Sequence, residues 1–286
     1  MIRIVTDSAA DLPQQDIEAL GITVAPLFIQ FPEGEIDAAD LTPDQFYDRL
    51  RAMAPDVPTT AQPSPGIFAN LYREMESDED GILSIHISSG LSGTIQSADL
   101  AATQVDVPVQ TVDTMTLSGG ERFQVLAAAR AARAGWSRES IVERLEQIRN
   151  ATEVVFTLET LEYLARGGRI GRVQALAGTL LKLKPVIHVD KSDGKYSTVG
   201  KARTLNRTRQ QIVSFLADRY GSDEPLWISV MHGQFADQAN TLATELEEVL
   251  AVEKLEVLRI SPVLGVHTGP GIVGAAVVPI SLLNIE

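Results

Sequence analysis

Short apolar runs alternate with amphipathic segments along the first half of the chain. Runs of Ile, Val, Leu and Phe between turn residues predict strands, and they lie at residues 2–8, 26–31, 81–88 and 107–113. Helical periodicity fills the intervals. Five helices are predicted: one from Thr42, one at 66–77, one after the turn at 89–93, one at 118–134 and a separate one that ends at Asn150. Strands separated by helices of this length are typical of an α/β fold with a mostly parallel, doubly wound sheet.

Two of these helices are predicted to start at capping boxes. Thr42-Pro43-Asp44-Gln45 places an N-cap threonine three residues before a glutamine, with proline in the first turn. Ser118-Gly119-Gly120-Glu121 has the same spacing. Both patterns favour a helix that begins at the hydroxyl residue.

The pattern changes after residue 150. Strands are predicted at 153–158 and 226–231, and Ser192-Asp193-Gly194 between two apolar runs predicts a hairpin. Helices are predicted from 159 to Gly167, at 173–183, at 203–220 and at 235–251, and two final strands complete the chain. We therefore predict two domains: an N-terminal α/β domain at 1–150 and a C-terminal α+β domain with a mixed sheet at 151–286.

Composition narrows the classes of function. The chain has 286 residues, 38 acidic and 24 basic, for a formal net charge of −14. Such a charge repels nucleic acid and anionic lipid surfaces, and no apolar run reaches the length of a membrane span. The absence of cysteine excludes disulfides and thiolate chemistry. We expect a cytoplasmic protein that binds no nucleic acid and has no stable membrane insertion.

The segment Ser88-Ser89-Gly90-Leu91-Ser92-Gly93-Thr94 joins a predicted strand to a predicted helix. It is not a P-loop, because Thr94 stands where lysine is required, and it is not a nucleophile elbow, because that motif ends in glycine. Several hydroxyls and backbone N–H groups at a helix N-terminus favour an anion site. An alternative makes Ser92 the nucleophile of a hydrolase with His267 as its base.

Two further segments carry candidate chemistry. The glycines at 269, 271 and 274 match G-x-G-x-x-G, but only 12 residues follow, too few for a dinucleotide-binding unit. His267, just before them, is predicted at a surface turn facing a ligand. The four histidines are far apart in sequence and match no zinc motif, so no metal site is predicted.

Arginines cluster around the predicted helix stop at Gly167-Gly168. Arg166 suits the dipole of that helix, but Arg169 and Arg172 lie beyond the stop. With Lys201 and Arg203, they could gather on an otherwise acidic surface to meet an anion.

In order along the chain, TDSAADLP, PTTAQPS, SSGLSGT, DTMTLSGG, LEYLARGGRIGR, LKPVIHVDKSDGKYSTVGKAR and HTGPG resemble the motifs of the DegV family from residue 3 to 280. The resemblance implies a two-domain cytoplasmic protein that binds one long-chain fatty acid in a tunnel. It also implies the FakB role, in which a binding subunit of bacterial fatty acid kinase presents the carboxylate to a separate ATP-binding kinase subunit. No cofactor and no catalytic residue are then expected in this chain.

The resemblance also implies roles for individual residues. Thr60, Ser92 and Gly93 would hold the carboxylate, with Arg169 and His267 close to it. Arg172 and Arg203, together with His267, would face the kinase or the acyl phosphate. Ala61 stands where the family often has serine, but Thr60 is retained. The apolar stretch after Arg172 is a candidate tunnel wall, formed by Val173, Leu176 and Leu180.

Burying a lipid chain is energetically sufficient for such a role. A 16-carbon chain contributes about 11 kcal/mol gross, at roughly 0.8 kcal/mol per methylene, from which association costs are subtracted. An unpaired buried carboxylate would cost more than the remainder, so polar partners are required and a nucleophile is not. A Ser92-dependent lipid ester or thioester hydrolase and a carrier of another acidic lipid remain alternatives.

Overall fold

The computed structural model describes residues 1–75, 80–173 and 183–285. Its first sheet contains four parallel strands in the order β2-β1-β6-β7. These strands are β1 (Arg3–Asp7), β2 (Thr23–Ala25), β6 (Ile82–His86) and β7 (Val109–Asp113). β6 is buried along its whole length because helices cover both faces of the sheet.

Helices lie on both faces of this parallel sheet. α5 (Ser118–Arg133) packs against β1 and β6 and contacts α1 (Gln14–Leu20) on one face. α3 (Pro65–Arg73) and α4 (Thr94–Ala102) pack together over the other face. The doubly wound arrangement predicted from the alternating pattern is confirmed, although the three-residue strand β2 was not predicted.

A second, mixed sheet contains six strands in the order β10-β9-β8-β13-β11-β12. They are β8 (Glu153–Leu158), β9 (Lys184–Asp190), β10 (Lys195–Ala202), β11 (Leu226–His232), β12 (Val252–Arg259) and β13 (Ile272–Pro279). Only β11 and β12 pair in parallel, and β9 and β10 form the predicted hairpin around Ser192-Asp193-Gly194. α9 (Leu205–Tyr220) and α10 (Ala236–Glu247) cover one face.

A small antiparallel sheet, in the order β4-β3-β5, was not predicted as a sheet. Its strands are β3 (Phe28–Phe31), β4 (Gly34–Asp37) and β5 (Thr59–Ala61). The helix between β4 and β5, α2 (Pro43–Ala52), begins with the predicted capping box, in which Thr42 and Gln45 exchange hydrogen bonds. α11 (Pro262–Thr268) packs against β3 and β5. This contact places Thr60 of β5 next to the C-terminal part of the chain.

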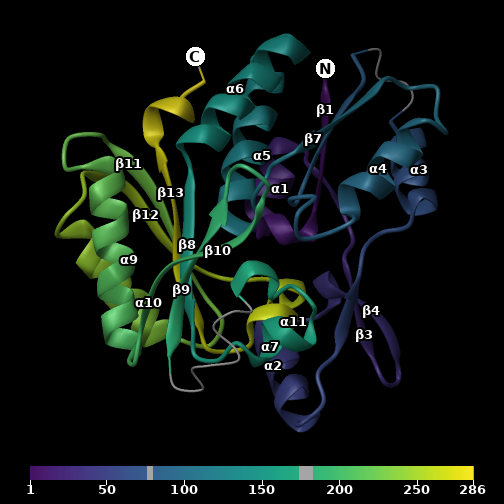
Figure 1. Ribbon diagram of the computed structural model, residues 1–286. Coiled ribbons are helices and arrows are strands. Elements are labelled where there is room, and N and C mark those ends of the chain that lie inside the picture. The colour runs from purple at the N-terminus through teal and green to yellow at the C-terminus, as the bar shows by residue number, and fades with distance from the viewer. Residues whose placement is uncertain (76–79, 174–182, 286) are drawn as a thin grey trace.

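The two large sheets lie on opposite sides of α5, so helices and sheets alternate in layers across the molecule (Figure 1). α5 also contacts β8 and β13 of the mixed sheet, while α6 (Arg138–Ala151) packs beside it. Almost every residue of α5 is therefore buried. The remaining short elements are α7 (Glu162–Arg166) and the 3₁₀ turns Ser8–Ala10, Ala38–Asp40, Gly171–Val173 and Ile280–Leu282.

One local prediction is wrong, and two others are not tested by the structure. The capping box at Ser118 is wrong, because Leu117 occupies the N-cap and the Ser118 hydroxyl instead bonds the carboxylate of Asp11. The helix predicted at 173–183 falls almost entirely outside the described residues. The strands of the parallel sheet precede residue 150 and those of the mixed sheet follow it, and the division into domains 1–150 and 151–286 stays a prediction.

Candidate ligand-binding site

A cavity of about 310 Å³ lies where α11, β5 and the turn before α4 meet. We call it the head cavity. Four of the residues singled out in the sequence border it: Thr60, Ser92, Arg169 and His267. The rest of its lining is mostly apolar and comprises Leu27, Ala61, Gln62, Ile87, Leu91, Leu117, Tyr196, Val263 and Leu264. Polar groups from distant parts of the chain thus meet at one otherwise apolar cavity.

The turn before α4 supplies the hydroxyl of Ser92. That hydroxyl lies 2.8 Å from the Thr94 hydroxyl and accepts the Thr94 N–H at 3.3 Å. Gly93 stands at the N-cap of α4 and has no side chain to cap the helix, so an anion can approach the backbone N–H groups of the first turn. A Cβ on residue 93 would lie only 2.7 Å from Nε2 of Gln62, so an alanine here would have to displace the Gln62 amide.

His267 lies on α11, where it forms one side of the head cavity. Its Nε2 is 2.8 Å from the hydroxyl of Thr60, and its Nδ1 is buried without a partner among the described residues. Burial, with a smaller contribution from the nearby charge of Arg169, lowers the pKa of His267 from 6.5 to about 4. The ring is therefore neutral at pH 7. The predicted surface turn is wrong, because the glycine-rich segment follows this helix and the ring is largely enclosed.

The guanidinium of Arg169 is held by two carbonyl groups. Nη1 donates to Gly167 at 2.7 Å, and Nε donates to Leu91 at 3.3 Å. The second bond joins the loop after α7 to the turn that carries Ser92. A Cβ at Gly167 would collide with Nδ1 of His267, so the glycine stop lets α7 approach α11. The guanidinium of Arg169, predicted to lie near the ligand, therefore borders the cavity as a contribution from the C-terminal part of the chain.

The other two arginines do not line the cavity. Arg172 is half exposed and forms ion pairs with Asp190 at 3.2 Å and Asp193 at 2.9 Å, at the tip of the β9–β10 hairpin. This tip packs on the Ser92 turn through a hydrogen bond of 2.8 Å from the Ser88 hydroxyl to the Gly194 carbonyl. Arg203 is exposed at the end of β10, just before α9. Their roles as a partner-facing rim stay predictions.

A smaller apolar cavity of about 30 Å³ adjoins the head cavity, and we call it the tail cavity. Both cavities are lined by Leu117, Tyr196 and Leu264. The rest of the tail cavity's lining comes from Ser118, Val154, Phe156, Met231, Ile260, Thr268, Ile272 and Gly274. Of the predicted tunnel residues, Val173 is fully buried in the main core but lines neither cavity. Leu176 and Leu180 lie outside the described residues.

Some lining residues were missed by the sequence analysis. Gln62 belongs to a motif that was noted, and its amide donates to Ser97 at 3.1 Å beside Gly93. Tyr196 gave no signal, since an aromatic residue in a strand is ordinary. It is almost fully buried, and its ring meets that of Phe156 edge to face, with centroids 5.4 Å apart.

The hydrogen bonds of Ser92 and His267 do not link these two side chains to each other. The hydroxyl of Ser92 pairs with Thr94, and His267 pairs with Thr60. A catalytic triad also needs a carboxylate on Nδ1 of its histidine, and no described residue fills that role here. Among the described ranges, no group of three or more His, Asp or Glu side chains is arranged to hold a metal ion.

The layered sheets and the cavity define an α/β protein with a ligand-sized cavity, lined by a few polar groups and mainly apolar residues. The chain belongs to the DegV family, because the family model described as "Uncharacterised protein, DegV family" matches residues 1–280. A DegV domain-containing protein of Streptomyces coelicolor is 37% identical over 279 residues, covering 96% of this chain and 98% of its own.

Solved structures share the whole fold. A DegV family protein from Thermus thermophilus, described by its fatty acid binding, superposes with a TM-score of 0.91 at 37% identity, covering 97% of this chain and 99% of its own. DegV from Bacillus subtilis, described as a fatty acid binding protein, has a TM-score of 0.88 at 31% identity and covers 97% and 98% of the two chains. Across the described parts of the present chain, no helix is long and apolar enough to span a bilayer.

Proposed function

We propose that this protein binds one long-chain fatty acid, with the carboxylate in the head cavity and the acyl chain directed towards the tail cavity. The observation that carries the proposal is the composition of the head cavity. Two hydroxyls, an imidazole and a guanidinium converge at a cavity whose other lining residues are mainly apolar. A pocket of a few hundred Å³ with few polar groups is typical of a small-molecule site, and this distribution fits an amphiphilic acid.

Each polar group has a distinct part in holding the carboxylate. The hydroxyls of Thr60 and Ser92 can donate once they turn from their present partners, and Arg169 supplies the positive charge that a buried anion requires. Nδ1 of His267 is buried without a hydrogen-bond partner, alone in this among the described side chains that line the head cavity. Gly93 contributes backbone rather than a side chain. The fatty acid binding described for the Thermus and Bacillus relatives supports the same ligand class.

We further propose that the protein is a cytoplasmic carrier rather than an enzyme, and that a separate ATP-binding kinase subunit phosphorylates the bound carboxylate. The turn carrying Ser92 adjoins the β9–β10 hairpin, whose aspartates hold Arg172. A partner that binds this face meets Arg172 next to the head cavity, with Arg203 at the far end of β10. Both cations suit the phosphate chemistry of such a partner.

Lipid binding is tested first by mass spectrometry of an organic extract of the purified protein. We expect a stoichiometric long-chain fatty acid from the wild type and from Thr241→Ala, a control in which an exposed hydroxyl on α10 is removed. The double variant Thr60→Ala, Ser92→Ala should remain folded by circular dichroism and lose most of its lipid. Normal lipid content in the double variant, or a different acidic lipid in the wild type, would contradict the proposed ligand.

The carrier role is tested with lipid-loaded protein and the kinase subunit of the same organism. Arg172→Ala and Arg203→Glu should retain their fatty acid but yield at least tenfold less acyl phosphate, a loss of about 1.4 kcal/mol in transition-state stabilisation. Unchanged acyl phosphate formation by both variants would remove these arginines from the partner surface. Labelling of Ser92 by a fluorophosphonate would instead favour the hydrolase.

A further inference from the structure

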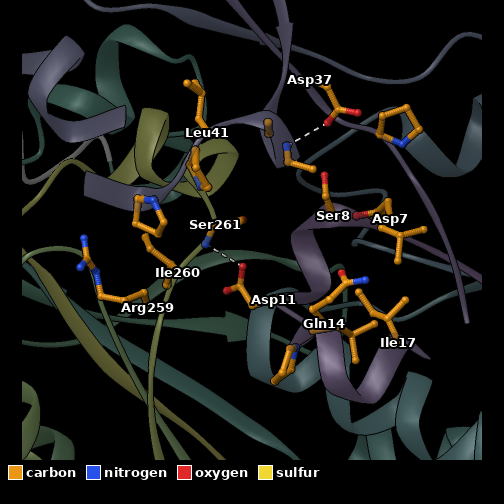
Figure 2. A pocket seen from close by; sticks show the side chains of 18 of the residues that line it. Asp7, Ser8, Asp11, Gln14, Ile17, Asp37, Leu41, Arg259, Ile260 and Ser261 are labelled. Carbon is orange, nitrogen blue, oxygen red and sulfur yellow. Dashed lines mark hydrogen bonds between the residues drawn. The ribbon is translucent and has the colours of Figure 1, made fainter. Parts of the chain in front are cut away.

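The tail cavity lies next to a third cavity, of about 440 Å³, which shares a lining residue with the tail cavity and none with the head cavity. We call this third cavity the outer pocket. It is formed by the segment after β1, the 3₁₀ turn at Ala38–Asp40 and the residues from the end of β12 to α11. Figure 2 shows it from close by, with Asp11 and Gln14 on one side and Arg259, Ile260 and Ser261 on another. The three cavities thus follow one another through the molecule.

One apolar residue lines both of the last two cavities. Ile260 lines both the tail cavity and the outer pocket, and it is only 3% exposed. Its N–H is fixed by a hydrogen bond of 3.0 Å to the carbonyl of His232. Ile260 is the residue that the two linings share among the described residues, so it lies between the two cavities.

A polar cluster completes the partition beside Ile260. Asp11 accepts the Ser118 hydroxyl and, at 2.8 Å, the N–H of Ser261, the second of which is drawn in Figure 2. Ser118 belongs to the tail cavity, whereas Asp11 and Ser261 belong to the outer pocket. Breaking these bonds inside the protein would leave polar groups unsatisfied, so the terminal methyl group of an acyl chain cannot displace them. Ile260 is the part of the partition that side-chain size alone determines.

We propose that Ile260 sets the upper limit on the length of the bound acyl chain, with the Asp11–Ser118–Ser261 cluster as the fixed remainder of the end wall. The inference rests on the proposed function, since it assumes that the acyl chain passes Leu117, Tyr196 and Leu264 into the tail cavity. Apolar side chains, among them Leu12, Ile17, Val24 and Leu258, contribute much of the outer pocket's lining. Removing the Ile260 side chain would therefore join the tail cavity to a space that tolerates further methylenes.

The test uses the full-length protein, depleted of lipid and loaded from an equimolar mixture of saturated fatty acids of graded length. Native mass spectrometry then gives the chain-length profile of the bound lipid. Ile260→Ala should shift the profile to chains longer by about two or three methylene groups, because the substitution removes three carbon atoms. Leu258→Ala is the matched control: Leu258 lies two residues earlier and lines the outer pocket alone, so its profile should equal that of the wild type.

The outcomes separate the two proposals. If the wild type binds no fatty acid from the mixture, the proposed function is wrong, and the length limit is wrong with it. If the wild type and Ile260→Ala both bind stoichiometrically with the same profile, only the role of Ile260 is refuted. Should Ile260→Ala fail to fold, Ile260→Val removes one carbon and should give a smaller shift in the same direction. An unchanged profile in that variant would refute the role equally.

Discussion

Protonation of His267 should destabilise the folded protein between neutral pH and about pH 4. The pKa of this ring is lowered from 6.5 to about 4, first by burial and then by Arg169. Below pH 6.5 the unfolded chain binds a proton that the folded protein does not, so the unfolded state gains stability as the pH falls. The stabilisation of the folded state is complete above pH 6.5, decreases as the pH falls, and becomes constant once the folded ring is also protonated.

The size of the effect follows from the two pKa values. A difference of about 2.5 pH units corresponds to about 3 kcal/mol at most. The linkage relation gives a loss of about 1.4 kcal/mol near pH 5.5 and about 2.5 kcal/mol near pH 4.5. Asp11 has the opposite effect on stability, because burial raises its pKa from 3.8 to about 6. Its contribution to the stability of the folded protein is complete below pH 3.8 and is lost as the pH rises from there through about 6.

Comparison with His267→Gln isolates the histidine, since glutamine does not titrate and its amide can still reach Thr60. Urea unfolding of both lipid-free proteins at several pH values between about 7.5 and 4.5 gives the free energy of unfolding at each. The wild type should lose more stability on acidification than the variant, by the amounts above. Parallel curves for the two proteins over this whole range would refute the argument that the ring is buried and neutral.

Three further substitutions have defined outcomes. Gly194→Ala should destabilise the protein by about 1–3 kcal/mol in urea unfolding, because residue 194 has φ +64° and a Cβ would collide with the Ser88 hydroxyl. Wild-type stability of this variant would mean that the β9–β10 hairpin does not pack on the turn before α4. Glu256→Ala should lower the free energy of unfolding by about 3–5 kcal/mol in the same assay, because it removes the ion-pair partner of Arg122, whose side chain is 1% exposed. A decrease below about 1 kcal/mol would contradict that pairing. Gly93→Ala should bind less fatty acid at unchanged fold, because its Cβ would crowd the glutamine amide beside the cavity; unchanged lipid content would speak against a backbone contact there.

The sequence predicted the large sheets because their signals are local. Apolar strands that alternate with amphipathic helices indicate a parallel sheet, and Ser-Asp-Gly indicates a hairpin. The small sheet was missed because β5 has three residues, too few for any periodicity to appear. The capping box at Ser118 failed for a tertiary reason: the hydroxyl bonds Asp11, which is distant in sequence but adjacent in the fold.

The polar part of the candidate site was predictable, and its apolar part was not. Thr60, Ser92, Arg169 and His267 stood out because hydroxyl, cationic and imidazole groups beside glycines are uncommon in a plain core, and all four line the head cavity. Leu117, Leu264 and Ile260 look like any other core residues in the sequence. Only the three-dimensional packing shows that they border empty space. Arg172 was expected as an available cation, but two aspartates pair with it.

The hydrogen bond between Thr60 and His267 joins residues 207 positions apart in the sequence. During synthesis, the head cavity cannot close until α11 has left the ribosome, after the strands β1 to β12 have been made. A shortened or nascent chain that ends before α11 therefore lacks the histidine side of the cavity. Under the proposed function, the ligand is acquired only after α11 has docked on β5, and occupancy of the cavity reports that this contact has formed.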